Sequence, residues 1–490
     1  MRCASSWQDN DGNDEENVLT LADVFEALTH IRPVIAPLVI TEAAIDSRQV
    51  ISGGLFVAIS GERVDGHSFI TQAFQRGALA ALIERDVEEP FTLVDTRPGA
   101  QMTLPARLNP PILIRVENTV AALQKIAAFW RQKLTLRVIG ITGSVGKSTT
   151  KEAVAQVLSQ RYHTLKSVAN LNNEIGLPLN VLRLTPGHQY AVLEMGFYIP
   201  GEIAQLCEIA RPQVGVMNNI GTVHAERAGS QETIAQGKGE LVESLPSAPE
   251  GVAILNQDDA LVRPMAARTR ARIFTYGLDP SSDLWADDVM GMGLEGIRFR
   301  LHYGNEILHL RVPMIGRHSV HTALRAAAVG LVENLTWDEI VRGLQESQTQ
   351  LRLVAVRTEN GALLLDDTYN ASPESTLAAL TLLEELPARR IAVLGDMLEL
   401  GPYEREGHEK VGARAAEVAE TLVTLGIRAH IIAESARRAG MKRQNIYEYE
   451  DREALTAWLQ QNILSGDSVL IKGSHGLHME RIVAALEAAQ

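Results

Sequence analysis

The segment most clearly suited to chemistry is a glycine-rich run, GITGSVGKS, at residues 140–148. An apolar stretch precedes it, and a helical pattern follows it. Glycines let backbone N–H groups crowd around a polyphosphate, and a helix N-terminus adds partial positive charge. Lys147 would reach the terminal phosphates, and the Ser148 hydroxyl would ligate Mg²⁺. The run departs from G-x-x-x-x-G-K-[ST] because Ile141 stands where that pattern has glycine, so a turn without ligand is the alternative.

The elements around this run alternate between short apolar strands and helical patterns from residue 113 to 333. That alternation predicts βαβ units and a mainly parallel sheet. The strand candidates are LRVIGIT (136–142), YAVLEM (190–195), VGVMNNI (214–220), GVAILN (251–256) and RIFTYG (272–277). Residues 296–312 instead alternate with period two around Gly304-Asn305, which predicts an antiparallel hairpin.

Two further segments flank this one. Residues 18–112 begin with a helical stretch at 19–29, followed by a buried strand at 55–59 and a helix ending at Gly77, and their proline-containing part 86–111 is typical of a long loop. Residues 334–490 alternate again, with strand candidates at 363–367, 390–396, 429–434 and 467–473. The sequence therefore predicts an α/β fold of three domains, 18–112, 113–333 and 334–490, after a disordered tail at 1–17.

Composition narrows the class of protein. Of 490 residues, 46% are hydrophobic and 22% charged, as in globular domains. The net charge of −14 argues against a nucleic-acid-binding surface. No apolar run approaches the roughly 20 residues needed to cross a bilayer, so we expect no membrane insertion. The N-terminus does not resemble a signal peptide, and only two cysteines are present, which fits a reducing cytoplasm.

Several further blocks follow one another along the chain: TGSVGKSTTKE (142–152), NLNNEIGLPL (171–180), LEMG (193–196), NIGTVHAE (219–226), QGKGELV (236–242) and GRHSVHTALRAA (316–327). In this order they resemble the blocks of the Mur ligase family, and the last is similar to that family's GxHNxxNALAA segment. The resemblance covers residues 18–490. LLLDDTYNASPES (363–375) with AVLGDMLELG (392–401) looks like the member that adds D-alanyl-D-alanine. Residues 45–69 resemble the family's UDP-binding domain. The resemblance implies a small UDP-binding domain, a central ATPase domain and a C-terminal Rossmann-like domain.

The reaction that this resemblance implies is an ATP-dependent amide ligation in peptidoglycan precursor synthesis. ATP would phosphorylate the carboxylate of UDP-N-acetylmuramoyl-tripeptide, and the amine of D-alanyl-D-alanine would attack the acyl phosphate. We expect a monomer acting in the cytoplasm. Two alternatives stay open: another amide ligase of the family that adds a single amino acid, and a nucleotide-binding homologue that does not catalyse.

The resemblance also assigns the ATP and metal sites. Its ATP-binding residues are Thr142, Gly143, Ser144, Val145, Gly146, Lys147, Ser148, Thr149, His318, Arg352 and Asp367. Ser148 and Glu194 would hold one Mg²⁺ and His224 a second, with Lys238 as a carbamate beside the metal. Lys147, Glu194, His224 and Lys238 would be the catalytic residues. From the residues alone, a structural His224 and a solvated Lys238 would be favoured.

The sequence departs from the family pattern at some positions, and the resemblance also assigns substrate-binding residues. Ser319 and Thr322 replace the family's two Asn residues, which puts the adenine contacts in doubt, and Leu351 replaces a Gly before Arg352. The substrate residues implied by the resemblance are Ser47, Arg48, Asp65, Gly66, His67, Asn172, Asn173, Asn370 and Ser372. Ordinary turn and cap chemistry is the alternative for Asp-Gly-His and for Asn-Ala-Ser-Pro.

Overall fold

The computed structural model describes residues 18–61, 64–87, 91–100, 108–223, 225–346 and 354–487. The chain divides into two compact units. The first unit contains Met1–Val138, Tyr162–Met195 and Gln205–Pro212, and the second contains Ile139–Arg161, Gly196–Ala204 and Gln213–Gln490. The predicted tail at 1–17 lies outside the described residues.

The first unit contains a parallel sheet with strand order β1-β2-β3-β5-β4. Its strands are β1 (Ala43–Ala44), β2 (Leu55–Val57), β3 (Ala80–Ile83), β4 (Thr92–Asp95) and β5 (Ile112–Arg115). The prediction of a loop throughout 86–111 is wrong, because β4 lies inside it and buries Val94. The sheet also continues to Arg115, past the predicted boundary at 112.

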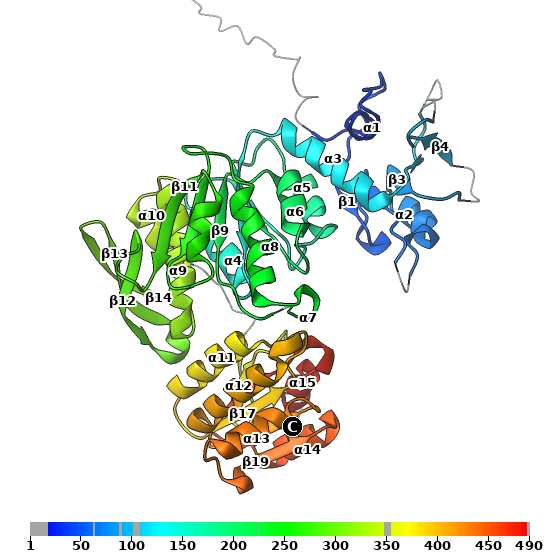
Figure 1. Cartoon of the computed structure of the whole chain (residues 1–490). Coiled ribbons are helices and arrows are strands. Elements are labelled where there is room, and N and C mark those ends of the chain that lie inside the picture. Colours follow the sequence, from blue (N-terminus) through cyan, green and yellow to red (C-terminus); the bar gives the residue numbers. More distant parts are fainter. Residues whose placement is uncertain are drawn as a thin grey trace, which may run out of the picture. The chain divides into compact units, whose positions relative to one another are not determined.

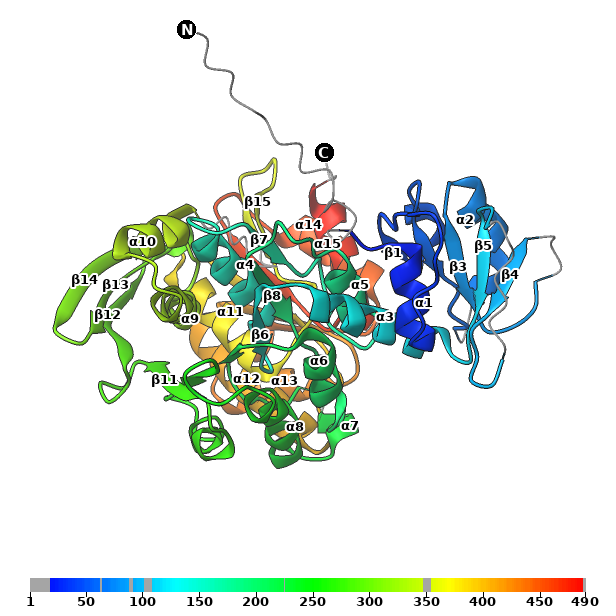
Figure 2. The same cartoon turned by 90° about the horizontal axis from the view of Figure 1, so that it is seen from above.

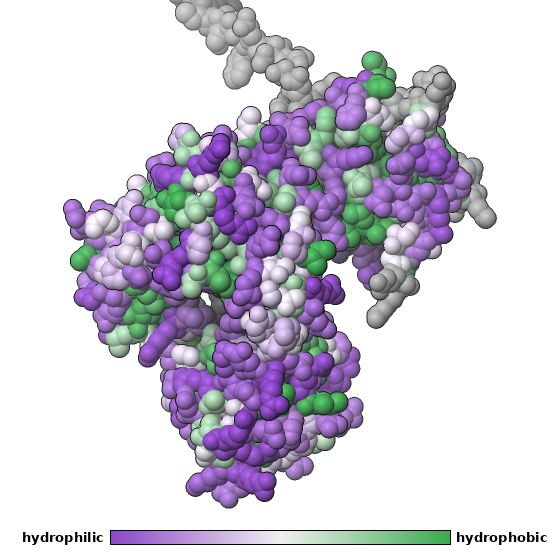
Figure 3. All heavy atoms as spheres, viewed as in Figure 1, coloured by the Kyte–Doolittle hydropathy of each residue, from purple (hydrophilic) through white to green (hydrophobic). Residues whose placement is uncertain are grey.

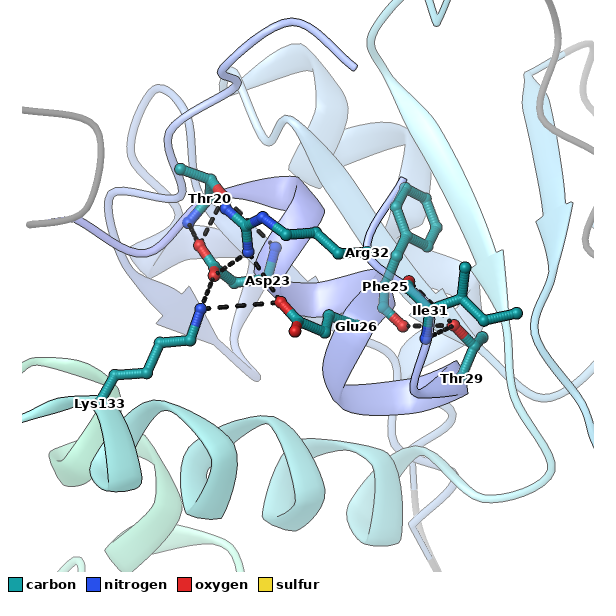
Figure 4. A network of polar contacts seen from close by, with 8 residues as sticks. All are labelled: Thr20, Asp23, Phe25, Glu26, Thr29, Ile31, Arg32 and Lys133. Carbon is teal, nitrogen blue, oxygen red and sulfur yellow. Dashed lines mark hydrogen bonds and ion pairs between the residues drawn. The ribbon is translucent and has the colours of Figure 1, made fainter. Parts of the chain in front are cut away.

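The helices of the first unit are α1 (Leu21–Thr29), α2 (Ile70–Gln75), α3 (Thr119–Lys133) and α5 (Gly176–Leu182), and α3 packs against α1 and α5. Figure 4 shows the polar network between α1 and α3. Buried Asp23 accepts from Lys133 Nζ at 2.5 Å and from Arg32 Nη1 at 2.6 Å. Burial alone would raise the pKa of Asp23, but the hydrogen bonds from Lys133, Thr20 and Arg32 lower it. These bonds fix the N-terminal helix to α3.

The remaining strands of the first unit are β7 (Thr164–Lys166) and β8 (Tyr190–Glu194), which pair in parallel. Strand β8 matches the predicted strand at 190–195 and ends at Glu194. Helix α6 (Glu202–Ala210) follows, and its residues are divided between the two units.

The second unit contains strands in the order β14-β13-β12-β11-β10-β9-β6. They are β6 (Arg137–Thr142), β9 (Val214–Met217), β10 (Val252–Asn256), β11 (Arg272–Gly277), β12 (Leu284–Gly291), β13 (Ile297–Tyr303) and β14 (Glu306–Val312). Pairing is parallel from β6 to β12 and antiparallel from β12 to β14. The predicted hairpin is confirmed, because Tyr303 pairs with Glu306 across Gly304-Asn305.

The helices beside these strands are α4 (Lys147–Leu158), α7 (Ala225–Ala228), α8 (Gln231–Glu243), α9 (Val320–Val332) and α10 (Trp337–Glu346). Helix α4 packs against α9 and α10, and α10 also contacts β14 (Figure 2). Residues 337–346, which the sequence prediction placed in the third domain, therefore pack on the helices of the central one.

The C-terminal part of the second unit is a six-stranded sheet of order β15-β16-β20-β17-β18-β19. Its strands are β15 (Val354–Arg357), β16 (Leu363–Asp366), β17 (Arg390–Gly395), β18 (Thr421–Leu425), β19 (Ile446–Tyr449) and β20 (Ser468–Lys472). Only β15 runs antiparallel to its neighbour. Helices α11 (Pro373–Glu385), α12 (Glu404–Val418) and α13 (His430–Arg438) share one buried core cluster, while α14 (Arg452–Asn462) and α15 (Glu480–Glu487) share another (Figure 1).

One predicted strand of this sheet is wrong. Residues 429–434 begin helix α13 instead of forming a strand. The buried positions Ile432, Ala433 and Ala436 follow helical spacing, and a short apolar run cannot by itself separate a helix from a strand. The strand at this point of the alternation is β18, which comes earlier.

The surface agrees with the globular composition. Hydrophilic residues predominate on the visible face of the C-terminal sheet and its helices (Figure 3). Within the described parts of the chain, no helix combines the length and apolar character that a bilayer crossing requires.

Candidate active site

The phosphate loop joins β6 to α4 within the second unit. Gly146 is the N-cap of α4 with φ 79°, a left-handed conformation that glycine adopts without strain. No side chain caps this helix, so its first N–H groups point to the loop as an anion-binding N-terminus. Lys147 Nζ donates to the carbonyls of Gly143, at 2.8 Å, and of Ser144, at 3.3 Å. The loop backbone, Gly146 and Lys147 therefore lie together in one compact turn.

The turn after β9 holds this loop in shape. Asn219 accepts from the Val145 N–H at 2.9 Å and donates to the Val145 carbonyl at 3.1 Å. The Ser144 hydroxyl accepts from the Gly221 N–H at 2.8 Å. Asn218 donates to the Val145 carbonyl at 3.1 Å and lies so close to Gly143 that a Cβ there would meet its own Cβ at 2.5 Å. Sequence analysis missed Asn218 and Asn219 as site residues, although Asn-Asn directly after a strand was a signal.

Lys238 lies beneath the same loop. It projects from α8, is fully buried, and donates from Nζ to the Gly143 carbonyl at 3.1 Å. Its ammonium also lies 4.9 Å from the centroid of the Phe197 ring. The reading of Lys238 as a solvated helix lysine is therefore wrong, because the side chain reaches the phosphate loop.

In the first unit, Glu194 ends β8 and is 1% exposed. Asn172 Nδ2 donates to Glu194 Oε1 at 2.8 Å, so two predicted site residues are brought together. Asn173 instead accepts from the Gly176 N–H at 2.9 Å at the start of α5. Glu194 offers the hard oxygen that Mg²⁺ prefers, which fits the predicted ligand role. The described residues contain no group of three or more His, Cys, Asp or Glu suited to a metal ion.

The segment 316–327 forms the start of α9. Ser319 is the N-cap residue, and its hydroxyl donates to the Ile315 carbonyl at 2.6 Å. His318 keeps part of its surface exposed, yet its pKa falls to about 4, first because packed atoms displace water and then because His321, Arg325 and Lys472 add positive charge nearby. Thr322 accepts from Arg325 at 3.1 Å.

The loop after β16 contains three predicted site residues. Lys472 Nζ donates to Asp367 Oδ2 at 2.6 Å and to the Asn370 carbonyl at 2.8 Å. Ser372 caps α11 by accepting from the Ser375 N–H, in a reciprocal capping box. Lys472 was missed, because nothing local in the sequence links β20 to this loop. Two other predicted site residues, His224 and Arg352, lie outside the described residues.

The residues predicted to contact the UDP-linked substrate already make polar contacts within the first unit. Ser47 donates to Gln72 at 2.7 Å, and exposed Arg48 binds Asp46 and lowers the pKa of that carboxyl to about 2. His67 Nδ1 lies 2.8 Å from Asp65, and its Nε2 accepts from the Glu84 N–H at 3.0 Å. A Cβ on Gly66 would meet the Ile59 backbone at 2.7 Å. The turn reading accounts for these contacts, and substrate binding there stays a prediction.

Comparison with known proteins establishes the class. Residues 141–330 match the Mur ligase middle domain, 351–475 the Mur ligase glutamate ligase domain, and 39–131 the Mur ligase family catalytic domain. The chain belongs to the Mur ligase family.

Two similar relatives carry the same name. A protein from Synechocystis called UDP-N-acetylmuramoyl-tripeptide–D-alanyl-D-alanine ligase is 38% identical over 90% of this chain and 91% of its own length. A Bacillus subtilis protein of the same name is 36% identical over 91% of this chain and 93% of its own. The structure resembles MurF from Acinetobacter baumannii, with TM-score 0.81, 29% identity and coverage of 96% and 99% of the two chains. It also resembles a Thermotoga maritima MurF ligase in complex with ADP, with TM-score 0.76, 28% identity and coverage of 91% and 97%.

Proposed function

We propose that this chain is an ATP-dependent ligase that joins D-alanyl-D-alanine to UDP-N-acetylmuramoyl-tripeptide. The products would be UDP-N-acetylmuramoyl-pentapeptide, ADP and phosphate, made in the cytoplasm by a monomer. The carrying observation is the preformed phosphate loop, where Lys147 and Lys238 converge on the Gly143 carbonyl. Relatives named for this reaction, similar over 90% or more of the chain, supply the choice of substrates.

The chemical problem is the meeting of two anions. The tripeptide carboxylate must attack the γ-phosphorus of ATP, giving an acyl phosphate and ADP. The D-alanyl-D-alanine amine then adds to the acyl carbon, loses a proton, and expels phosphate. Fixed positive charge is usually the largest contribution to lowering the activation free energy of such a step. Lys147 provides it by exchanging its carbonyl contacts for phosphate oxygens, while the uncapped terminus of α4 holds the remaining charge.

We propose that Mg²⁺ is the metal cofactor. We assign one ion to the Ser148 hydroxyl and to Glu194, whose carboxylate offers the hard oxygen that Mg²⁺ prefers. The ion would neutralise phosphate charge when bound. We place a second ion at His224 beside a carbamate on Lys238. Because Lys238 is fully buried, converting its amine to an anion requires a paired cation, and this proposal is tested by labelled bicarbonate and carbon NMR.

The other two domains would present the reaction partners. We assign Ser47, Arg48, Asp65, Gly66 and His67 to the UDP-linked substrate, with Asn172 and Asn173 near its phosphates. Arg352 and Asp367 would touch the nucleotide from the third domain, and Asn370 and Ser372 would receive the dipeptide. We propose three domains, with the first predicted limit, at 112, moved beyond β5 (Ile112–Arg115) and the second, at 333, moved beyond α10 (Trp337–Glu346), and limited proteolysis tests both limits.

The deciding experiment measures phosphate release and product mass. Purified protein, ATP, Mg²⁺ and UDP-N-acetylmuramoyl-tripeptide receive D-alanyl-D-alanine, D-alanine or no acceptor. Release and a pentapeptide product with the dipeptide alone support the proposal. A UDP-N-acetylmuramoyl-dipeptide that accepts a single amino acid, while the tripeptide is inert, would point to another ligase of the family. ATP binding without release under any acceptor would indicate a non-catalytic homologue.

A further inference from the structure

Arg325 is a buried cation that the reaction described above does not use. It lies on α9 and is 4% exposed. Its Nε donates to the His321 carbonyl at 2.9 Å, and its Nη2 donates to the Thr322 hydroxyl at 3.1 Å. The guanidinium also lies 5.8 Å from the centroid of the Tyr276 ring. All of these partners are neutral.

Asp258, the carboxylate that contacts His321 on the same helix, is held by other donors. Asp258 accepts from His321 Nε2 at 2.7 Å and from the backbone N–H groups of Leu278 and Asp279. Within the described ranges of the chain, no ion pair includes Arg325, and burial lowers its pKa. A buried charge without a counter-ion costs several kcal/mol, so a purely structural arginine would be a poor choice at this position.

The guanidinium of Arg325 lies beside the N-terminus of α4. Both terminal nitrogens lie 3.9 Å from the point that a Cβ would occupy on Gly146, the N-cap of α4. Asn218 Nδ2 lies 3.6 Å from the same point, and the buried Asn218 Oδ1 has no hydrogen-bond partner. Arg325 therefore lies against the phosphate loop from the protein side, next to a polar atom whose hydrogen-bonding capacity is unused.

We propose that Arg325 is a further fixed cation of the nucleotide site, which positions the polyphosphate of the bound nucleotide by acting through the phosphate loop. The proposal rests on the ATP-dependent function inferred above. The phosphates would supply the counter-charge that the folded chain does not provide. Attraction through a poorly polarisable interior is stronger than through water, so a cation behind the loop still acts on charge in front of it. In the pattern GxHNxxNALAA, to which 316–327 is similar, an alanine stands at the place of Arg325.

Arg325 is thus a positioning residue, and the competing explanation is that it only ties α9 to β11 through its contact with the Tyr276 ring. The two explanations predict different changes in the stability of the ligand-free protein when Arg325 is replaced. If the Arg325 charge is compensated only by bound phosphates, replacing it by a neutral side chain of similar length leaves the ligand-free protein as stable or more stable. If it is a structural tie, the same replacement lowers the stability of the ligand-free protein.

The test uses Arg325→Met and Arg325→Lys in the full chain, with Arg438→Met as matched control. Arg438 lies on helix α13, where it pairs with Glu409 at an exposed position. Each variant is titrated calorimetrically with adenosine, AMP, ADP and ATP, and its melting temperature is measured without and with ATP. We expect Arg325→Met to weaken ATP binding about tenfold, ADP less, AMP less again and adenosine not at all, because the effect scales with charge. Arg325→Lys should recover part of the loss.

Equal weakening of all four ligands, or a lower melting temperature without ligand and an unchanged ATP-induced shift, would overturn the proposal. A KM for ATP that rises while kcat is held would support it, since a positioning charge acts on binding more than on chemistry. The double variant Thr322→Asn/Arg325→Ala should restore ATP binding toward the unmodified level. If the unmodified protein itself fails to bind ATP, the proposed function falls, whereas normal binding with a flat ligand series removes only Arg325 from the site.

Discussion

Two loops of the second unit have similar structures but lead into helices that are capped differently. The phosphate loop and the loop after β16 each leave a parallel strand and enter a helix, and each is held by a buried lysine from another element: Lys238 for the first and Lys472 for the second. Helix α4 starts at a glycine with no side-chain cap, whereas α11 starts at Ser372 with a full capping box. An open helix start can receive phosphate, and a closed one cannot without losing its cap. On the proposed function, the first loop would therefore receive the nucleotide phosphates, and the second would contribute through side chains.

The largest expected effect tests the open helix start. Lys147→Ala should lower the rate of phosphate release by about a thousandfold or more, because the variant lacks the movable cation nearest the transferred group. Steady-state rates with all three substrates measure it. If the variant forms the peptide bond at a rate within tenfold of the unmodified enzyme, Lys147 of the phosphate loop is not needed for the reaction. The proposed functional difference between the two loops would then be wrong.

The next effect concerns the lysine of the closed loop. Lys472→Met leaves the carboxylate of Asp367 and the Asn370 carbonyl without their common donor, and we expect a loss of about 3 kcal/mol in the free energy of unfolding. Urea denaturation measures it. The double variant Lys472→Met/Asp367→Asn should lose less than the single one, because the charge that needs pairing is gone. Equal losses would mean that the ion pair is not the cause.

A smaller effect tests the N-cap of α11 independently of the start of α4. Ser372→Ala should cost about 1 kcal/mol of stability by removing the N-cap of α11, with no change in the affinity for ATP. Thermal unfolding and ATP titration of the same preparations measure both quantities, with Ser372→Thr as the variant that keeps a hydroxyl. A parallel loss of ATP affinity would show that the two helix starts are not independent.

The smallest effect is the part of the pH dependence of stability that comes from His408 on helix α12. His408 is fully buried, donates to the Glu404 carbonyl and accepts from the Met397 N–H. Burial lowers its pKa, although Asp396 and Glu404 oppose the shift. The unfolded chain binds the proton first, so the stabilising contribution is complete above about pH 6.5 and is lost as pH falls below that value. His408→Gln should flatten the stability curve between about pH 5 and 7, and an unchanged slope would contradict this.

Local patterns predicted the parts of the structure that local forces decide. The phosphate loop and the hairpin at Gly304-Asn305 follow from glycine and from strand periodicity, and both were found where expected. Strand β4 was missed because four residues inside a proline-containing stretch carry too little pattern. Helix α13 was taken for a strand because a short apolar run fits both periods.

The site shows the same limit. Lys147 and Ser148 could be assigned from spacing, because the motif itself positions them. Asn219, Arg325 and Lys472 reach their partners across long stretches of sequence, and only the packing of β9, α9 and β20 brings them to a loop. In the N-terminal domain, Asp65 and His67 were named as substrate contacts, but they contact each other, and Asp65 also pairs with Arg85 while His67 accepts from the Glu84 N–H. Spacing alone does not distinguish a turn that binds from a turn that only folds.

Strand β14 has a consequence for behaviour at high concentration. It is the outermost strand of its sheet, and its exposed positions include Glu306, His309 and Arg311. An outer strand offers unpaired backbone groups to a neighbouring molecule, and charged side chains along it make such stacking unfavourable. Replacing these side chains by apolar ones would favour fibrous or amorphous aggregates during expression, even where the folded enzyme is unaffected.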